Sequence, residues 1–222
     1  MKDLRNKFTV DFLEEGALVS KKGNFSTVMK VRDSNGEVYC GKLPKMLNIS
    51  CEIFNLPFSD LEEVRSKFNY NKSYFSRVFE SFKHEAYIAK EIYDGFEHTV
   101  RPEGATEVKV EGFKDFYLPA FVNEFDEEMR GISKDNSCKN FNKESDSILK
   151  DLISSGFELN WDSWGRDNFL YSKRRGLKII DFNMVGFKGK FNPHPMYRPD
   201  NRDIVNDIKN NTFYWKKTYH LD

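Results

Sequence analysis

Residues 160–185 constrain the fold of this chain more than any other stretch. The segments FLY at 169–171 and LKII at 177–180 favour β-strands, and the polar, glycine-containing turn SKRRG separates them. We therefore expect a small β-hairpin. Its strands would bring Asn168, just before the first strand, close to Asp181, just after the second.

An amide and a carboxylate that converge on one point provide oxygen ligands for a hard cation. Mg²⁺ is such a cation, and it usually keeps waters and phosphate oxygens as its other ligands. Asn168 and Asp181 are therefore the predicted metal ligands. The upstream carboxylate of Asp162 is not needed as a metal ligand and is free for a different role.

This stretch resembles the catalytic segment of the protein-kinase-like family. The family pattern H-R-D-x-x-x-x-N, followed by a hairpin and D-F-G, is similar to NWDSWGRDN followed by IIDFN. The resemblance implies phosphoryl transfer from ATP with Mg²⁺, or Mn²⁺ in its place. It implies that Asp162 is the base that orients the acceptor hydroxyl. Arg166 would place positive charge near the γ-phosphate, or would pack the loop.

The segment also departs from the family pattern. Asn160 stands in place of the histidine, and Asn183 stands in place of the D-F-G glycine. The spacing from Asp162 to Asn168 is one residue longer than in the family, so a one-residue bulge is needed to present Asp162.

Residues 17–43 read as three antiparallel strands, with a hairpin turn at residues 34–36. Gly23, in KKGNFSTV, resembles the one surviving glycine of the kinase loop that covers the phosphates. Lys42, in VYCGKL, lies close to where the family has the lysine that contacts the α- and β-phosphates. Without the resemblance, Gly23 reads as an ordinary turn residue and Lys42 as a solvated lysine.

A carboxylate on a helix should hold that lysine. The sequence SRVFESFKHEAYIAKEIYDGF at 76–96 has its apolar residues on one helical stripe and predicts an amphipathic helix. Glu85 is the expected partner of Lys42, with Glu80 and Glu91 as competitors. Residues 44–75 before this helix read as an insertion that contains one short helix.

Two further strands, around residues 99–113 and 114–128, complete a five-stranded sheet. The second strand leads into a hinge whose main-chain groups face the adenine edge, and the resemblance assigns this role to Asn123, Glu124 and Phe125. Residues 133–145 read as a linker. SDSILKDLISSGFEL predicts a helix capped by its first serine or aspartate, and this helix delivers the chain to Asn160.

The resemblance implies an α+β, bilobal protein-kinase-like fold. Its N-lobe, residues 1–125, would hold a five-stranded antiparallel sheet and a helix. Its shortened helical C-lobe, residues 126–222, would hold the catalytic loop and a terminal helix. Because only 41 residues follow Asp181 and no A-P-E motif is present, the chain is most similar to the minimal effector kinases that bacteria inject into host cells by type III secretion.

Composition excludes several classes of protein. Thirty-five basic and thirty-five acidic residues cancel, so no overall field favours nucleic acid or anionic membrane. The three cysteines lack metal-site spacing and are expected to be free thiols. No apolar signal segment or membrane span is visible, which predicts a cytoplasmic protein, or one secreted into a host cytosol without a cleavable signal.

We therefore expect a small protein kinase that acts on Ser or Thr, rather than Tyr, of a protein substrate from a host cell, with an activating partner protein as a further option. Lys42, Asn168 and Asp181 would meet around one nucleotide in a crevice between two lobes. The alternatives are a pseudokinase that binds a partner and a small-molecule phosphotransferase, with AMP transfer as a minor option. The exposed basic turn at residues 173–175 reads as a solvated turn rather than a docking patch.

Overall fold

A computed structural model describes residues 7–12, 14–20, 26–44, 72–132, 141–159, 166–182 and 185–188. The chain divides into two compact units. The first comprises residues 1–86 and 102–125, and the second comprises residues 87–101 and 126–222. Both units combine helix with strand, which confirms the predicted mixed α+β class. The assignment of the units to kinase lobes and the insertion at 44–75 remain predictions.

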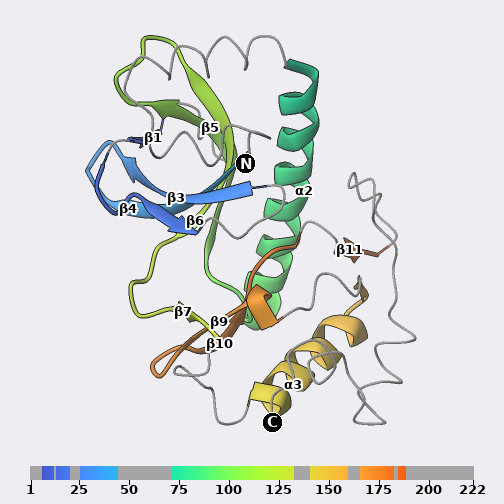
Figure 1. Cartoon of the computed structure of the whole chain (residues 1–222). Helices are drawn as coiled ribbons and strands as arrows, with labels where there is room; N and C mark the ends of the chain where they lie inside the picture. Colours follow the sequence, from blue (N-terminus) through green and yellow to red (C-terminus); the bar gives the residue numbers. More distant parts are fainter. Residues whose placement is uncertain are drawn as a thin grey trace. The chain divides into compact units, whose positions relative to one another are not determined.

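The first unit is built on a six-stranded sheet (Figure 1). Its strands are β1 (Phe8–Val10), β2 (Leu18–Ser20), β3 (Ser26–Asp33), β4 (Val38–Pro44), β5 (Pro102–Val110) and β6 (Tyr117–Glu124). They lie in the order β1-β5-β6-β4-β3-β2, and β1 also pairs with β3. Five strands therefore close on themselves into a small barrel, with β2 attached to β3.

The closure, the sixth strand and one parallel pairing correct the expectation of a five-stranded antiparallel sheet. β1 pairs in parallel with β5, through Thr9 and Lys109, and antiparallel with β3, through Phe8 and Asp33. Phe8 and Val10 are fully buried, so the barrel interior holds this short strand in place. Local sequence patterns do not predict these pairings, because both partners of β1 are distant in sequence.

Alternate side chains of these strands point into the barrel and form its core. The largest of them include Phe8, Met29, Tyr39 and Leu43, and Phe113 and Phe116 from the β5–β6 connection pack in the same core. Gly41 also faces this interior, since a Cβ atom at that position would lie 2.6 Å from Cγ1 of Val31. The residue before Lys42 is therefore a glycine because the core leaves no room for a side chain.

The β3–β4 turn forms where the sequence predicts it. The Asp33 carboxylate accepts hydrogen bonds from the backbone N–H groups of Asn35, at 2.8 Å, and Glu37, at 3.0 Å. Gly36 supplies the left-handed residue, with φ of 80°. The register of β3 and β4 then places Lys42 opposite Val28.

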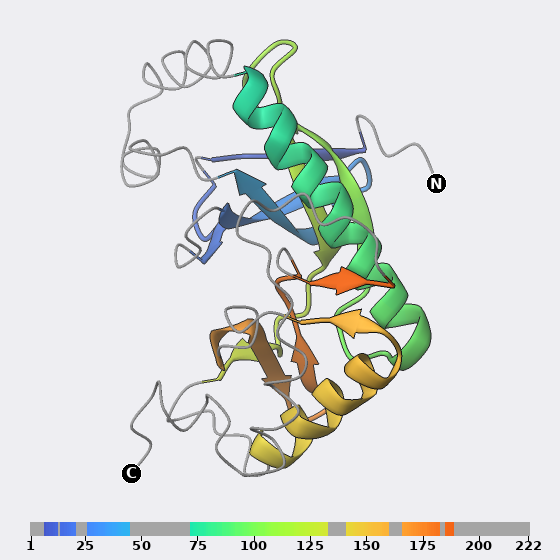
Figure 2. The same cartoon turned by 90° about the vertical axis from the view of Figure 1, so that its right-hand side faces the viewer.

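Helix α2 (Lys72–Phe96) matches the helix predicted from the apolar stripe, with four additional residues at its start. Its residues up to Ala86 belong to the first unit, where the helix runs beside the strands (Figures 1 and 2), and the remainder belongs to the second unit. The buried stripe includes Phe82, Ala86, Ile88, Ala89 and Ile92. Glu97, with φ of 54°, ends the helix.

Besides the end of α2, the described part of the second unit consists of short strands, one further α-helix and a 3₁₀ turn (Figure 2). Its elements are β7 (Arg130–Gly131), α3 (Phe141–Ser154), β8 (Phe157–Glu158), the 3₁₀ turn η2 (Arg166–Asn168), β9 (Phe169–Ser172), β10 (Gly176–Ile179) and β11 (Gly186–Phe187). The predicted hairpin is β9–β10, and β7 adds a third strand beside β9. β8 pairs with β11, so the chain after Asp181 returns beside the segment before Asn160.

The predicted start of the helix after the linker was wrong. α3 begins at Phe141, so Ser145 lies within the helix and does not cap it. The Ser145 hydroxyl is buried and donates a hydrogen bond to the carbonyl of Phe141 at 2.7 Å. Phe141 lies one helical turn earlier, so the helix backbone provides the acceptor for this hydroxyl. The linker is correspondingly shorter than expected.

Several other predictions lie outside the described residues. These are residues 45–71 of the predicted insertion and the terminal helix, whereas the last four residues of the insertion, 72–75, belong to α2. Cys51 and Cys138 also lie outside the described residues. Cys40 is a free thiol, and burial raises its pKa to about 12. Among the described helices, none is both long enough and apolar enough to cross a membrane.

Candidate functional site

Lys42 and Glu85 form a close ion pair in the first unit. Nζ of Lys42 lies 2.8 Å from Oε1 and 3.0 Å from Oε2 of Glu85. The Glu85 side chain is 1% exposed and that of Lys42 is 13% exposed. A buried carboxylate needs a cation beside it, so Glu85 holds the lysine at a defined position on β4.

The pairing decides between the three candidate glutamates. Glu80 lies in an exposed ion pair with Lys83, and Glu91 is half-exposed on α2. The prediction that Glu85 is the partner of Lys42 is therefore confirmed. Helical spacing alone could not make this choice, because all three residues lie on the same charged helix.

The predicted hairpin brings Asn168 next to the residue before Asp181. β9 and β10 pair from Phe169 opposite Ile179, and the backbone N–H of Ile180 donates to the carbonyl of Asn168 at 2.8 Å. Asn168 and Asp181 are both half-buried. Asp181 has φ of 69°, a left-handed conformation that aspartate adopts more readily than most residues, and one that concentrates at functional sites.

The segment after α2 anchors the end of β10. The backbone N–H of Ile179 donates to the carbonyl of His98 at 2.8 Å, and the buried hydroxyl of Thr99 donates to the carbonyl of Ile179 at 2.7 Å. His98 in turn contacts Asp151 of α3, with Nε2 and Oδ2 3.0 Å apart. Asp181 thus follows a strand end that is fixed on both sides. The sequence offered no local signal for these long-range contacts.

The donor atoms of Asn168 and Asp181 fit a hard divalent cation. One amide oxygen and one carboxylate would leave most positions of an octahedral ion to waters and phosphate oxygens, which is how Mg²⁺ is commonly held with nucleotides. No group of three or more His, Cys, Asp or Glu side chains suited to a metal occurs among the described residues. A metal held by Asn168 and Asp181 would take its remaining ligands from waters or phosphate oxygens.

The predicted adenine-binding segment lies at the end of β6. Asn123 pairs with Cys40 of β4 on one side and with Pro102 of β5 on the other, so it lies within the sheet. Glu124 pairs with Tyr39, and Phe125 follows the last paired residue. Nζ of Lys30 lies 5.4 Å from the centre of the Phe125 ring. Main-chain groups beyond the ladder are the candidates for contact with a base edge.

Other predicted site residues are not described. Gly23 and Asp162 lie outside the described residues, and Arg166 is described only through its backbone in η2. Their roles stay predictions.

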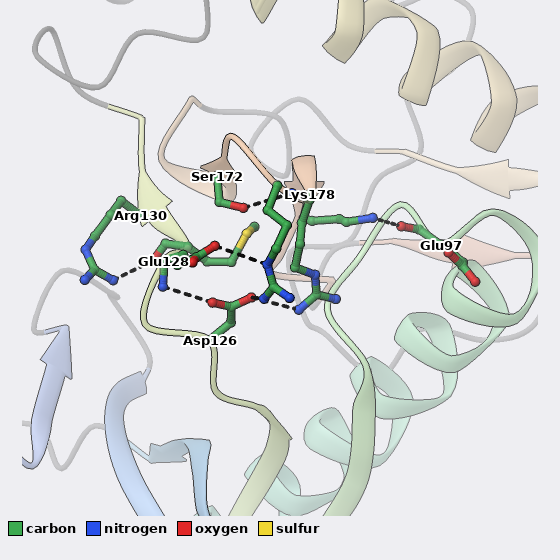
Figure 3. Close-up of polar contacts among 9 residues, drawn as sticks. Glu97, Asp126, Glu128, Arg130, Ser172 and Lys178 are labelled. Carbon is green, nitrogen blue, oxygen red and sulfur yellow. Dashed lines mark hydrogen bonds and ion pairs between the residues drawn. The ribbon is translucent and has the colours of Figure 1, made fainter.

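A charged cluster at the turn of the β9–β10 hairpin was missed (Figure 3). The Asp126 carboxylate is 9% exposed and accepts hydrogen bonds from Arg174, at 3.1 Å, and Arg175, at 3.3 Å. It also accepts one from the backbone N–H of Glu128, at 2.9 Å. Burial acts to raise the pKa of Asp126, but the Glu128 N–H and the two guanidinium groups outweigh it and lower this pKa below its ordinary value.

This cluster adds ion pairs to the basic turn at residues 173–175. Arg174 is 69% exposed, as expected of a solvated turn, while Arg175 is 20% exposed, and both are paired with the Asp126 carboxylate. The acidic run at 126–128 was the available signal in the sequence, although nothing local linked it to a turn more than forty residues later.

Comparison with solved structures shows that the chain has a protein-kinase-like fold. The crystal structure of the Rio2 kinase-ADP/Mg²⁺-phosphoaspartate complex from Chaetomium thermophilum is similar to it, with a TM-score of 0.52 and 15% sequence identity. The match covers 90% of this chain and 54% of the Rio2 chain, so this chain spans about half of the length of that chain. No protein-family model matches the sequence, and no curated protein does.

Proposed function

We propose that the protein is a phosphotransferase that uses ATP and Mg²⁺. The observation that carries the proposal is the buried Lys42–Glu85 ion pair, which holds an ammonium group at the position where this fold contacts nucleotide phosphates. The amide of Asn168 and the carboxylate of Asp181, which flank the base of the β9–β10 hairpin, suit the accompanying metal ion. The similar Rio2 structure contains ADP and Mg²⁺, which supports the choice of ligand.

In this proposal the residues act mainly by placing charge. Lys42 would neutralise the α- and β-phosphates, and Asn168 and Asp181 would hold the metal that screens the transferred group. Asp162 would orient the acceptor hydroxyl. Arg166 and Gly23 would contact phosphate oxygens, and the segment Asn123–Phe125 would contact the base. The metal supplies charge neutralisation when it is bound.

The proposal also specifies the group that accepts the phosphate. We assign it to a Ser or Thr hydroxyl of a protein, because NWDSWGRDN and IIDFN resemble the catalytic segment of the protein-kinase-like family. We further propose a bacterial effector that acts on a host protein, with an activating partner protein as a further option.

The test uses ATP labelled at the γ- or the α-phosphate, with Mg²⁺ and a lysate as the source of acceptor proteins. We expect label from γ only, lost in Asp181→Ala and strongly reduced in Asp162→Ala, because a positioned base contributes about 10²- to 10⁴-fold. Asp94→Ala, which removes an exposed carboxylate on α2, is the matched control and should keep full activity.

A pseudokinase is the second candidate. The longer spacing from Asp162 to Asn168 and the asparagine at position 183 favour it. ATP binding without transfer of label from either position would support the pseudokinase, and label from the α-phosphate would indicate AMP transfer. Either result would contradict the proposed kinase.

A further inference from the structure

The turn of the β9–β10 hairpin is held by the segment that directly follows β6. Asp126 binds Arg174 and Arg175 of the turn, and Glu128 binds Nε of Arg174 at 3.2 Å. Figure 3 shows Asp126 and Glu128 beside the hairpin, with Arg130 on the same segment. We call Asp126, Glu128, Arg174 and Arg175 the turn cluster.

The same segment contacts the hairpin at a second place, through strand pairing. It continues into β7, where Arg130 pairs with Tyr171 and Gly131 pairs with Leu170 of β9. β9 is thus the central strand of the order β10-β9-β7. A hairpin of two short strands is at best marginally stable alone, and a third strand is what usually makes such a unit persist. The geometry of β9–β10 therefore depends on residues 126–131.

The opposite end of this hairpin carries the predicted metal ligands. Each strand is four residues long, so the turn and the Asn168–Asp181 end lie about 13 Å apart along the strand. Thr99 and His98 fix the last residue of β10. Ligands of a metal must be held within a few tenths of an ångström, and a loosened turn lets the paired strands shift together.

The contacts of the turn cluster are unequal. Arg174 is 69% exposed and Glu128 is 61% exposed, so their bond is an ordinary surface ion pair of small effect. Asp126 is 9% exposed and Arg175 is 20% exposed, and a buried carboxylate with three donors has few alternative partners. Asp126 is therefore the centre of the cluster, with Arg175 as its main partner.

We propose that Asp126 is a positioning residue for phosphotransfer, which acts through Arg175 and the β9–β10 hairpin to hold Asn168 and Asp181 in metal-binding geometry. This inference rests on the proposed function. Nothing in it requires Asp126 to touch the nucleotide, the metal or the acceptor.

The experiment compares the full chain with Asp126→Asn, which removes the charge but keeps the size of the side chain. Mn²⁺ binding in the presence of ADP, followed by electron paramagnetic resonance, reports on the metal ligands without any turnover. Residues that support metal ligands usually affect metal affinity or activity by about 10- to 100-fold, so we expect Mn²⁺ affinity and kcat to fall by about 10-fold, with a smaller change in the KM for ATP. Amide hydrogen exchange should accelerate in residues 168–180.

Two further variants distinguish positioning from general stability. Arg175→Gln should reproduce the loss, and the double variant should lose no more than either single one, because both remove the same contact. Asp126→Glu should restore part of the Mn²⁺ affinity. Glu128→Gln is the matched control, since it removes a neighbouring exposed charge, and it should leave Mn²⁺ affinity and kcat unchanged. Arg175→Gln decides the question if Asp126→Asn does not fold.

Lower thermal stability with unchanged Mn²⁺ affinity would show that the cluster is only structural and would overturn the inference. A wild-type chain that binds no Mn²⁺ with ADP would overturn it as well. If the wild type binds Mn²⁺ but transfers no phosphate, the proposed function fails while the inference is still judged on metal affinity.

Discussion

Lys42 lies at the end of β4 with its ammonium group on a carboxylate that water barely reaches. Replacing Lys42 with Met should abolish phosphate transfer, with a loss of at least about 100-fold, because a preorganised charge on the phosphates disappears. It should also destabilise the fold by about 3 kcal/mol, since the Glu85 carboxylate stays buried without this cation.

The control for this change is Lys109→Met on β5 of the same sheet, where the lysine is half-exposed. Its stability should change by less than about 0.5 kcal/mol. Phosphate-transfer assays and chemical denaturation of both variants check the prediction. Equal effects of the two substitutions would contradict a special role for Lys42.

Asp126 should make the stability of the protein depend on pH in the acid range. Its pKa is lowered in the folded state, so its contribution is complete above the unfolded pKa of about 3.9 and is lost as the pH falls through the lower folded value. The difference in free energy of unfolding between the wild type and Asp126→Asn should therefore be constant from about pH 5 to 8 and shrink below about pH 4.

Urea denaturation at a series of pH values measures this difference. A gap that stays constant down to pH 3 would mean that Asp126 is not held as a carboxylate by the turn cluster. Glu128→Gln serves as the control, because Glu128 is well exposed.

The closed barrel of the first unit depends on close packing between β3 and β4. Gly41→Ala would place a methyl group 2.6 Å from Cγ1 of Val31, a stiff β-branched side chain. We expect a loss of about 1–3 kcal/mol in the free energy of unfolding, as is typical of overpacked cores. Val31→Ala in the same chain should recover part of this loss, because it removes the clashing atom.

Gly95→Ala should have the opposite effect on stability from Gly41→Ala. Gly95 lies within α2, and no atom lies within 4 Å of the added methyl group. The exchange should stabilise the protein by about 0.5–1 kcal/mol through the intrinsic preference for alanine in helices. Thermal denaturation of the variants separates the two effects.

Local patterns predicted the elements of this fold well where turn residues and periodicity agree. The β3–β4 turn, α2 and the β9–β10 hairpin follow from Asp33 and Gly36, from the apolar stripe and from the SKRRG turn. Pairings between distant segments, such as β1 with β5 and β8 with β11, carried no local signal. The start of α3 was missed because a serine inside a helix resembles a cap until its hydroxyl is seen to bond Phe141.

The candidate site likewise contains residues that the sequence predicted and residues that it did not. The family resemblance led to Lys42 and Glu85, and the hairpin led to Asn168 beside Ile180, because the spacing of a hairpin determines which residues flank its base. Asp126 and Thr99 could not be predicted, since their partners Arg175 and Ile179 lie far along the chain.

On the proposed function, the free energy of unfolding of the whole chain should rise when nucleotide binds. A ligand at one hundred times its Kd adds about 2.7 kcal/mol to the free energy of unfolding, which corresponds to a rise in Tm of about 5–10 °C for a chain of this length. We expect this rise with ATP and Mg²⁺ together, a smaller one after EDTA is added, and none in Asp181→Ala. Scanning fluorimetry checks it, with Asp94→Ala as a variant that should respond like the wild type.

Strand β1 is three residues long, yet it joins β3 to β5. Removing residues 1–12 would leave an open edge on β5 and on the part of β3 that β2 does not cover, the arrangement by which sheets recruit strands from other molecules. Such a shortened protein should form dimers or larger assemblies during size-exclusion chromatography, even with every other residue intact. Strand β1 would then protect the neighbouring strand edges from association with other molecules. A label or fusion placed within β1 would carry the same risk of aggregation.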